Sequence, residues 1–364
     1  MNTTSVDNAA LLTTIDRVAT AFSRLRGIKE GLVTGNSASG IQFDEWDWEV
    51  GVGLYGFLRR AISTNDQKAL QELVAWYAGQ IERGLPPRQI NSTAPMLPLA
   101  ILVQHVDRPD FRALVEDWAE WLVKELPKTE DGGFQHVVKE RLNEGELWDD
   151  TLFMACLFLA RAGVLCERSE WIDEAVYQFV IHTRYLSDPV SGLWYHGWTF
   201  NGRHNFANAF WARGNAWITV AIPELFDLVP TLGEKDRRFL SNVLVSQVRS
   251  LKAYQRPDGM FTTLLDDPSS PLETSATAGI AYGILRAIDA GILDKDDRAY
   301  AERALAAVLA QIDEEGVVHG VSDGTPMGHD LDFYRRIPNV PTPYGQALTM
   351  LLLTEVFLEN GNRQ

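Results

Sequence analysis

Apolar positions recur at helical spacing along nearly the whole chain. In about twelve segments the apolar residues follow an i, i+3, i+4 pattern, which is typical of amphipathic helices, and no segment gives a convincing strand hairpin. The pattern predicts helices over Leu11–Leu25, Val50–Ser63, Asp66–Arg83, Ala94–His105, Phe111–Leu126, Leu152–Ala162, Trp171–Tyr185, Ala209–Leu228, Asp236–Leu251, Thr277–Ala290, Asp296–Ile312 and Thr342–Glu359. The fold class is therefore expected to be all-α.

Four connections between these segments share a signature, in which a small or acidic residue and a glycine are followed closely by an apolar or aromatic residue. They are Asp131-Gly132-Gly133-Phe134, Ser191-Gly192-Leu193-Trp194, Asp258-Gly259-Met260-Phe261 and Glu315-Gly316-Val317-Val318. They recur roughly every 60 residues, which suits a helix–loop–helix unit that must stack on its neighbours. Such units build either an open superhelical solenoid or a closed ring. Long, irregular loops rich in Trp, His and Gly favour the ring, an (α/α)6 barrel of six repeats, and no linker divides residues 1–364.

Composition narrows the possible partners. The formal net charge of −16 argues against nucleic acid, which requires a basic surface. An anionic substrate would need a locally basic pocket, because the overall field repels it. The only cysteines, Cys156 and Cys166, indicate no disulfide framework. The N-terminus lacks the basic and apolar regions of a signal peptide, and no apolar run reaches the length of a membrane span. We expect a cytoplasmic protein without membrane or nucleic-acid partners; oligomeric state is not indicated.

The segment Gly145–Ala155 carries the first candidate chemistry. Trp148, Asp149 and Asp150 stand directly ahead of the apolar run 152–162. An Asp at this place is most often a helix N-cap, which satisfies free backbone N–H groups. Alternatively, an aromatic wall raises the proton affinity of a catalytic acid, as in enzymes that protonate glycosidic substrates. The segment alone favours the cap.

Tryptophan is abundant, with 11 residues, and several adjoin His or Arg. Trp46 and Trp48 are two positions apart at a helix start, so they cannot share one helical face. Other groups are Trp194, His196 and Trp198, and Trp211, Arg213 and Trp217. Aromatic faces with interleaved polar groups suit sugars, although any single Trp is more often a core residue.

His136 and His196 each follow a glycine–aromatic loop, so in a closed ring of repeats both would point into one cavity. No pair of His or Cys stands at helical spacing backed by a carboxylate, and we expect no metal. Nor is there a phosphate-cradling loop or a dinucleotide fingerprint, so we expect no cofactor. Arg213 lies in a largely apolar helix and needs a counter-charge, which either a protein carboxylate or a ligand carboxylate could provide.

Six motifs occur along the chain in an order that resembles one enzyme family. They are Asn91–Met96, Trp148–Met154, Gly192–Trp198, Trp211–Trp217, Glu273–Ala278 and Tyr344–Leu348. Together they resemble the unsaturated rhamnogalacturonyl hydrolases, glycoside hydrolase family 105, which are related to the unsaturated glucuronyl hydrolases of family 88. The resemblance covers about residues 46–355, and it implies the same (α/α)6 barrel that the repeats indicate.

The resemblance implies a particular reaction. Polysaccharide lyases leave a C4=C5 double bond in the terminal uronic acid of their products, and the family hydrates this vinyl ether. An Asp protonates C4 and then, as a base, activates the water that adds at C5. The hemiketal opens and the glycosidic link is lost. The expected partner is thus an unsaturated uronyl oligosaccharide.

Positions are carried over one by one. The catalytic Asp of the family's Trp-x-Asp-Thr pattern corresponds to Asp150, and Asp149 would cap the helix or pair with a neighbour. The resemblance places the following residues at the substrate: His136 and Trp148 beside the acid, His196 near the uronate ring, Trp211, Arg213 and Trp217 around the uronate, and Trp46 or Trp48 stacked on the sugar. Asn91 stands where some family members have Asp; an amide can hydrogen-bond but cannot take a proton.

Two other functions remain open at this stage. One is the unsaturated glucuronyl hydrolase reaction on glycosaminoglycan or algal polysaccharide fragments. The other is a non-catalytic α-helical repeat that binds a protein partner, which predicts an open concave surface with scattered Trp and His. Convergence of Asp150, His196 and Arg213 on one pocket would separate the enzyme from the scaffold.

Overall fold

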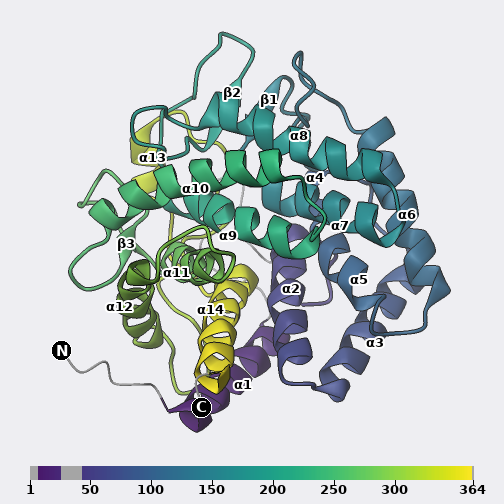
Figure 1. Ribbon diagram of the computed structural model, residues 1–364, viewed down its shortest axis with the longest axis horizontal. Coiled ribbons are helices and arrows are strands. Elements are labelled where there is room, and N and C mark those ends of the chain that lie inside the picture. The colour runs from purple at the N-terminus through teal and green to yellow at the C-terminus, as the bar shows by residue number, and fades with distance from the viewer. Residues whose placement is uncertain (1–6, 26–42, 363–364) are drawn as a thin grey trace.

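The computed structural model describes residues 7–25 and 43–362, which form one ring of helices inside another (Figure 1). The inner ring contains α2 (Trp48–Ser63), α5 (Met96–Leu102), η1 (Leu152–Cys156) continued by α7 (Leu157–Leu165), α9 (Ala212–Leu228), α11 (Thr274–Asp289) and α14 (Pro343–Asn362). The outer ring contains α1 (Asn8–Arg24), α3 (Gln67–Arg83), α6 (Pro109–Lys124), α8 (Ser169–Leu186), α10 (Glu234–Tyr254) and α12 (Arg298–Leu309). Short helices α4 (Ile90–Thr93), η2 (Lys295–Asp297) and α13 (Leu331–Arg335) lie in connections.

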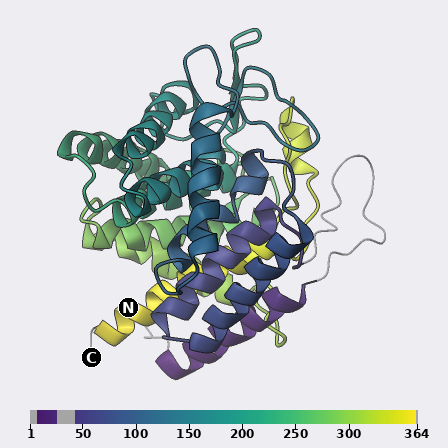
Figure 2. The ribbon, with the colours of Figure 1, turned by 90° about the vertical axis from the view of Figure 1, so that its right-hand side faces the viewer.

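The inner ring is closed. Each inner helix packs on the next, from α2 through α5, α7, α9 and α11 to α14, and α14 packs on α2. The first outer helix, α1, covers α14, so the two ends of the described chain lie side by side (Figure 2). The structure therefore confirms the (α/α)6 barrel, and the open solenoid is wrong. Residues 1–6, on which the expected lack of a signal peptide partly rests, lie outside the described residues.

Burial explains why the two rings differ in sequence. Inner helix α9 is buried on nearly all sides, and its sequence is apolar all round apart from a few polar residues. Outer helix α10 buries one stripe only, made of Leu240, Leu244, Gln247, Val248 and Leu251. A one-sided stripe at this spacing belongs to a helix that covers a core, and all-round burial belongs to the core itself.

Four short strands correct the expectation that the chain has no hairpin. β3 (Phe261–Thr262) pairs antiparallel with β4 (Leu272–Glu273). β1 (Glu146–Trp148) pairs antiparallel with β2 (Gly197–Thr199), although α7 and α8 lie between these two strands in the sequence. Strands of two or three residues are too short to show the alternation by which sequence analysis recognises them. The pairing of β1 with β2 brings Trp148 opposite Gly197, and so joins two of the sequence motifs.

The helix predicted over 152–162 begins as a π-helical turn at Leu152–Cys156 and ends at Leu165. π-Helical turns are rare and occur often at functional sites, and this one begins two residues after Asp150. Cys156 and Cys166 are both free thiols. None of the helices in the described part of the chain is long and apolar enough to cross a membrane.

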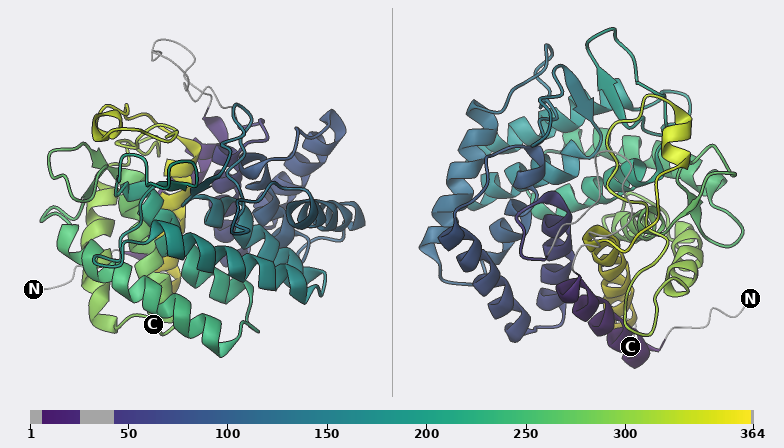
Figure 3. Two further views of the ribbon diagram at one scale, coloured as in Figure 1. Left: turned by 90° about the horizontal axis from the view of Figure 1, so that it is seen from above. Right: turned by 180° about the vertical axis from the view of Figure 1, so that it is seen from behind.

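The inner helices begin at the same end of the barrel. Arg213 at the start of α9 contacts Glu273 at the start of α11, and Tyr344 at the start of α14 stacks on Trp48 at the start of α2. Seen from behind, the segment that carries α13 passes in front of the inner helices (Figure 3). Long loops and helix N-termini thus gather at one mouth, where helix dipoles favour negative charge.

Candidate active site

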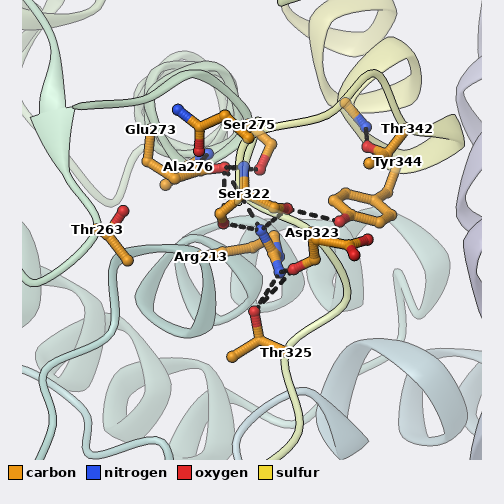
Figure 4. A network of polar contacts seen from close by, with 12 residues as sticks. Arg213, Thr263, Glu273, Ser275, Ala276, Ser322, Asp323, Thr325, Thr342 and Tyr344 are labelled. Carbon is orange, nitrogen blue, oxygen red and sulfur yellow. Dashed lines mark hydrogen bonds and ion pairs between the residues drawn. The ribbon is translucent and has the colours of Figure 1, made fainter. Parts of the chain in front are cut away.

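A buried cation lies among the helix starts at this mouth. The Arg213 side chain is 0% exposed, and its Nη1 lies 3.4 Å from Glu273 Oε1. Its two terminal nitrogens also donate to the Ser322 backbone carbonyl and hydroxyl, the Asp323 carbonyl and Thr325 Oγ1 (Figure 4). Glu273 in turn accepts hydrogen bonds from the Ser322 amide and the Ser275 hydroxyl. Protein groups therefore occupy the terminal nitrogens of Arg213, whereas Nε has no partner within residues 7–25 and 43–362.

Ring contacts lead from this cation to the candidate acid. The guanidinium lies between the rings of Trp211 and Tyr344, at 4.6 and 4.7 Å from their centroids. A continuous series of contacts joins Trp48 to Asp150. It runs through Trp48–Tyr344 (4.8 Å), Tyr344–Arg213, Arg213–Trp211, Trp211–His196 (4.3 Å), His196–Trp148 (5.4 Å), Trp148–His136 (4.2 Å) and His136–Asp150. Asp150, His196 and Arg213 thus belong to one continuous cluster, which excludes the scattered arrangement expected of a repeat scaffold.

Asp150 is the partly accessible acid of this cluster. Its side chain is 16% exposed, and its Oδ1 lies 3.4 Å from His136 Nδ1 without a hydrogen bond. Burial raises the pKa of Asp150 to about 7, although the Arg213 charge and nearby backbone amides oppose the shift. A carboxylic acid with this pKa is protonated in a large fraction at neutral pH and can give up that proton.

Asp149 is fully buried, and neither of its oxygens makes a hydrogen bond of good geometry. Burial and the neighbouring Asp150 raise its pKa well above the usual value, with the Arg213 charge opposing. Its Oδ2 would lie 1.9 Å from a Cβ at Gly214, so it packs directly on the first turn of α9. The helix after it has no side-chain cap. The expectation that Asp149 caps this helix is therefore wrong, because its side chain points toward α9.

The two histidines lie on either side of Trp148. His136 stacks on the indole with an interplanar angle of 7°, and His196 meets it edge-on. Burial lowers the pKa of His136 well below its usual value, and burial together with the Arg213 charge lowers that of His196 to about 3. Both imidazoles are therefore neutral at pH 7. His136 Nδ1 is 2.7 Å from Thr151 Oγ1, and His196 Nδ1 is 2.7 Å from the Tyr334 hydroxyl.

A hydrogen bond to Glu146 fixes the orientation of the Trp148 indole. Its Nε1–H donates to Glu146 Oε2 over 2.8 Å, and β1 carries both residues. The hydrogen bond fixes the indole orientation, so its apolar face stays against His136. An indole in this place helps to keep water from the neighbouring carboxyl group, which is consistent with the burial that raises the pKa of Asp150.

Several buried polar atoms of this cluster have no partner among the described residues. The nitrogen atoms among them are Trp211 Nε1, Arg213 Nε and His196 Nε2. The carboxyl oxygens among them are both oxygens of Asp149, Oδ1 of Asp150 and Oε2 of Glu49. Buried polar groups are nearly always paired in folded proteins, so a concentration of unpaired ones marks a place where a polar ligand completes the hydrogen bonding.

Two tryptophans proposed to contact sugar lie elsewhere. Trp46 is 8% exposed, stacks on Trp76 and is also packed by Tyr77 and Trp118, and its Nε1–H donates to the Ser92 carbonyl. Trp217 is 1% exposed and packs on Phe153. Both are core residues, because neighbouring rings cover the faces that a sugar would need. Of the pair Trp46 and Trp48, the structure brings only Trp48 to the cluster.

Asn91 lies in α4, which packs on α2 and on the turn η1 that follows Asp150. Its backbone N–H donates to the Gln89 side chain over 2.6 Å, and its side chain is partly exposed. The structure thus places Asn91 on the element beside the acid, as the motif order suggests, without showing a contact between the two side chains.

The sequence did not indicate the roles of several residues of the cluster, although Glu273 stands in one of the six motifs. Glu273 carries the counter-charge of Arg213, Glu49 adds a buried carboxyl group, and Tyr334 contacts His196. Burial and the charges of Asp323 and Asp47 raise the pKa of Glu49 well above its usual value. Glu273 could have been found as an acidic residue directly ahead of a helix. Tyr334 gives no such signal, because its segment has no helical period.

No group of three or more His, Cys, Asp or Glu side chains within 7–25 and 43–362 is arranged to hold a metal ion.

Comparisons with known proteins identify the family. The model of Glycosyl Hydrolase Family 88 matches residues 33–358. The chain belongs to this family. The unsaturated rhamnogalacturonyl hydrolase YesR of Bacillus subtilis is 30% identical over 85% of this chain and 89% of its own length. A crystal structure from Salmonella enterica, described as a possible member of the GH105 family, has a TM-score of 0.94 and 39% identity, covering 99% of this chain and 97% of that one.

A more distant neighbour shares the fold. The unsaturated glucuronyl hydrolase of Bacillus sp. GL1 has a TM-score of 0.72 at 18% identity, covering 95% of this chain and 96% of that one. The sequence-based resemblance to family 105 and its relatives is thus confirmed, and the protein is a glycosidase.

Proposed function

We propose that this glycosidase removes a terminal 4,5-unsaturated uronyl residue from oligosaccharides produced by polysaccharide lyases, with Asp150 as the proton donor. The observation that carries the proposal is the state of Asp150: a partly accessible carboxyl group whose Oδ1 has no hydrogen bond among the described residues, and whose pKa of about 7 keeps it protonated in large part at neutral pH. A protonated acid is what a vinyl ether requires, since its C4 is the nucleophilic carbon.

The steps follow from this protonation state. Asp150 gives its proton to C4, and the electron pair of the C4=C5 bond forms the new C–H bond. The positive charge that develops at C5 and the ring oxygen is stabilised by the carboxylate left on Asp150. That carboxylate then takes a proton from the water that adds at C5. The resulting hemiketal opens, the glycosidic bond breaks, and Asp150 is protonated again for the next cycle.

The unpaired donors of the cluster suit the uronate group. Trp211 Nε1 and Arg213 Nε are buried without partners, as is His196 Nε2. We assign to Arg213 a contact through Nε alone and a long-range attraction, because its terminal nitrogens are already bound. Burial raises the pKa values of Asp149 and Glu49 well above the usual range, which favours their uncharged forms and weakens the repulsion of a carboxylate by this acidic cluster.

Aromatic residues would hold the sugar ring beside Asp150. Trp148 and His136 flank the acid, and Trp48 stacks on Tyr344 at the opposite end of the ring contacts. We assign to Asn91 a hydrogen bond with a hydroxyl group or a water, since its amide cannot serve as a second acid. We propose cytoplasmic action on small oligosaccharides of the pectin type. The similarity to YesR, an unsaturated rhamnogalacturonyl hydrolase, supports the substrate class.

A panel of lyase products tests the substrate class. Unsaturated disaccharides from rhamnogalacturonan, from glycosaminoglycans and from algal polysaccharide are each incubated with the enzyme, and loss of the ultraviolet absorbance of the double bond is followed. The proposal predicts turnover of the rhamnogalacturonan product at the highest kcat/KM. Preference for a glycosaminoglycan product would instead assign the glucuronyl hydrolase reaction, and no loss of absorbance with any of them would refute the proposed function.

A further inference from the structure

The hydroxyl group of Tyr334 links a distant part of the chain to His196. Tyr334 lies in α13, is 1% exposed, and places its hydroxyl oxygen 2.7 Å from His196 Nδ1. The backbone N–H of Gly328 donates to the same oxygen over 3.2 Å. The hydroxyl has one proton to give, and its other neighbour is Met327 Sδ at 3.9 Å. An imidazole nitrogen at 2.7 Å is a far better acceptor than a thioether sulfur at that distance.

The direction of this hydrogen bond decides where His196 carries its own proton. A neutral imidazole has one protonated and one bare nitrogen. A Tyr334 hydroxyl that donates to Nδ1 leaves Nδ1 as the bare nitrogen and places the ring hydrogen on Nε2. We propose that Tyr334 is a positioning residue that fixes His196 as the Nε2–H tautomer, so that His196 meets a ligand as a hydrogen-bond donor and not as a base.

The surroundings of Nε2 show what this tautomer could bind. Nε2 is buried and has no partner among the described residues, as is also true of the nearby Trp211 Nε1. A buried N–H without an acceptor destabilises the empty site, and a ligand oxygen removes that cost. Two such donors on adjacent rings fit an acceptor oxygen, such as that of a carboxylate or a hydroxyl group.

The segment that carries Tyr334 also binds the buried cation of the site, Arg213. Ser322 and Thr325, a few residues upstream, bind the Arg213 guanidinium. Met327 packs on Gly197, where an added Cβ would lie 2.2 Å from its methyl carbon. Residues 322–334 therefore run across both Arg213 and His196, and this placement explains how one segment can orient two groups that face the ligand.

Nitrogen NMR of the full-length protein tests the tautomer without any substrate. In long-range proton–nitrogen spectra of protein labelled with 15N-histidine, protonated and bare ring nitrogens have widely separated shifts. A His196→Gln variant identifies the His196 signals by their loss. The inference predicts that His196 has a protonated Nε2 and a bare Nδ1 in the wild type. A proton on Nδ1 would overturn it, whatever the enzyme proves to catalyse.

Kinetics supply the second arm, and this arm rests on the proposed function. Tyr334→Phe removes the hydrogen bond to Nδ1, so His196 should no longer be fixed as the Nε2–H tautomer. As a result kcat/KM should fall about tenfold, the effect of one lost hydrogen bond. The matched control is Tyr77→Phe, which removes a buried hydroxyl that donates to the Pro95 carbonyl over 2.7 Å outside the cluster. The control should keep both the wild-type kcat/KM and the His196 spectrum.

The outcomes are distinguishable. A fall in kcat/KM with an unchanged His196 tautomer would overturn the inference, because Tyr334 would then act on packing alone. An unchanged tautomer with unchanged kinetics would overturn it as well. An enzyme inactive on every unsaturated product refutes the proposed function, while the wild-type spectrum still decides the tautomer.

Discussion

At the scale of single residues, the protonation state of Asp150 results from two opposing effects. Burial raises its pKa, and the positive charge of Arg213 lowers it, which leaves a value of about 7. Arg213 is itself neutralised by Glu273 and by backbone carbonyls, so its influence on the acid is moderate. Asp150 and Arg213 could be predicted from the sequence, and the family motif assigned the catalytic role to Asp150. The counter-charge of Arg213 and the burial of Asp150 could be seen only in the folded structure.

The pH dependence of the reaction follows from that pKa. Since Asp150 must be protonated to donate to C4, kcat/KM should be highest below about pH 7 and fall as pH rises through it, approaching tenfold per unit. Initial rates on an unsaturated disaccharide from pH 5 to 9 measure this profile. A rate that stays constant up to pH 9 would show that no acid of this pKa takes part.

The same shift predicts a stability effect. A raised carboxyl pKa means that the folded state binds more protons than the unfolded state between about pH 4 and 7, so stability falls as pH rises through that range. Asp150→Asn cannot ionise and avoids the loss. The variant should therefore be more stable than the wild type by ~4 kcal/mol at pH 8 and nearly equal to it at pH 4. Denaturant unfolding at the two pH values measures the difference, and an equal gap at both would contradict the shift.

At the scale of elements, the site is assembled from helix starts that local sequence only partly reveals. The 3.6-residue period predicted the helices, yet the start of the helix after Asp150 is a π-helical turn and β1 pairs with β2 over a long sequence separation. The spacing of Trp46 and Trp48 indicated different environments, but only packing showed that Trp46 is the core residue. Tyr334 was beyond prediction, because its partner lies 138 residues away.

Close packing of Asp149 on the first turn of α9 gives an element-scale prediction. A Cβ at position 214 would lie 1.9 Å from Asp149 Oδ2, so Gly214→Ala should displace Asp149, lower stability by roughly 2 kcal/mol and reduce kcat/KM. The control is Gly79→Ala in α3, where an added Cβ meets nothing within 4 Å. That variant should gain ~0.5–1 kcal/mol from helix propensity and keep full activity. Thermal melts and kcat/KM are measured for both variants. Equal stability and equal kcat/KM of the two would refute the close approach of Asp149 to Gly214.

At the scale of the whole molecule, ring closure is secured away from the site by a buried carboxylate. Glu224 on α9 accepts hydrogen bonds from the Tyr55 hydroxyl on α2 and the Tyr282 hydroxyl on α11, and Arg286 Nε lies 3.5 Å away. One residue thus joins three inner helices. The repeat spacing of the loops was enough to predict a closed barrel, but not which side chains connect its inner helices, since these come from separate repeats.

Removal of that carboxylate should weaken the ring without touching the chemistry. Glu224→Gln should lower the free energy of unfolding by about 3 kcal/mol, because it leaves buried partners poorly satisfied. The control, Glu72→Gln, breaks an exposed pair in which Lys68 Nζ and Glu72 Oε1 are 3.8 Å apart, and should change stability by less than ~0.5 kcal/mol. Denaturant unfolding compares them, with kcat per folded molecule expected to be unchanged in both. Equal stability of the two variants would show that Glu224 does not hold the ring.

The central claim is that Asp150 protonates C4 of the unsaturated uronyl residue. The most direct measurement follows, in one reaction, the ultraviolet absorbance of the double bond and the release of the second sugar, for the wild type and for Asp150→Asn, with circular dichroism as the check on folding. In the wild type, the loss of absorbance and the release of the second sugar should proceed together. The folded Asp150→Asn variant should lose at least roughly 10³-fold in rate. An active Asp150→Asn enzyme, or sugar release that leaves the double bond intact, would contradict it.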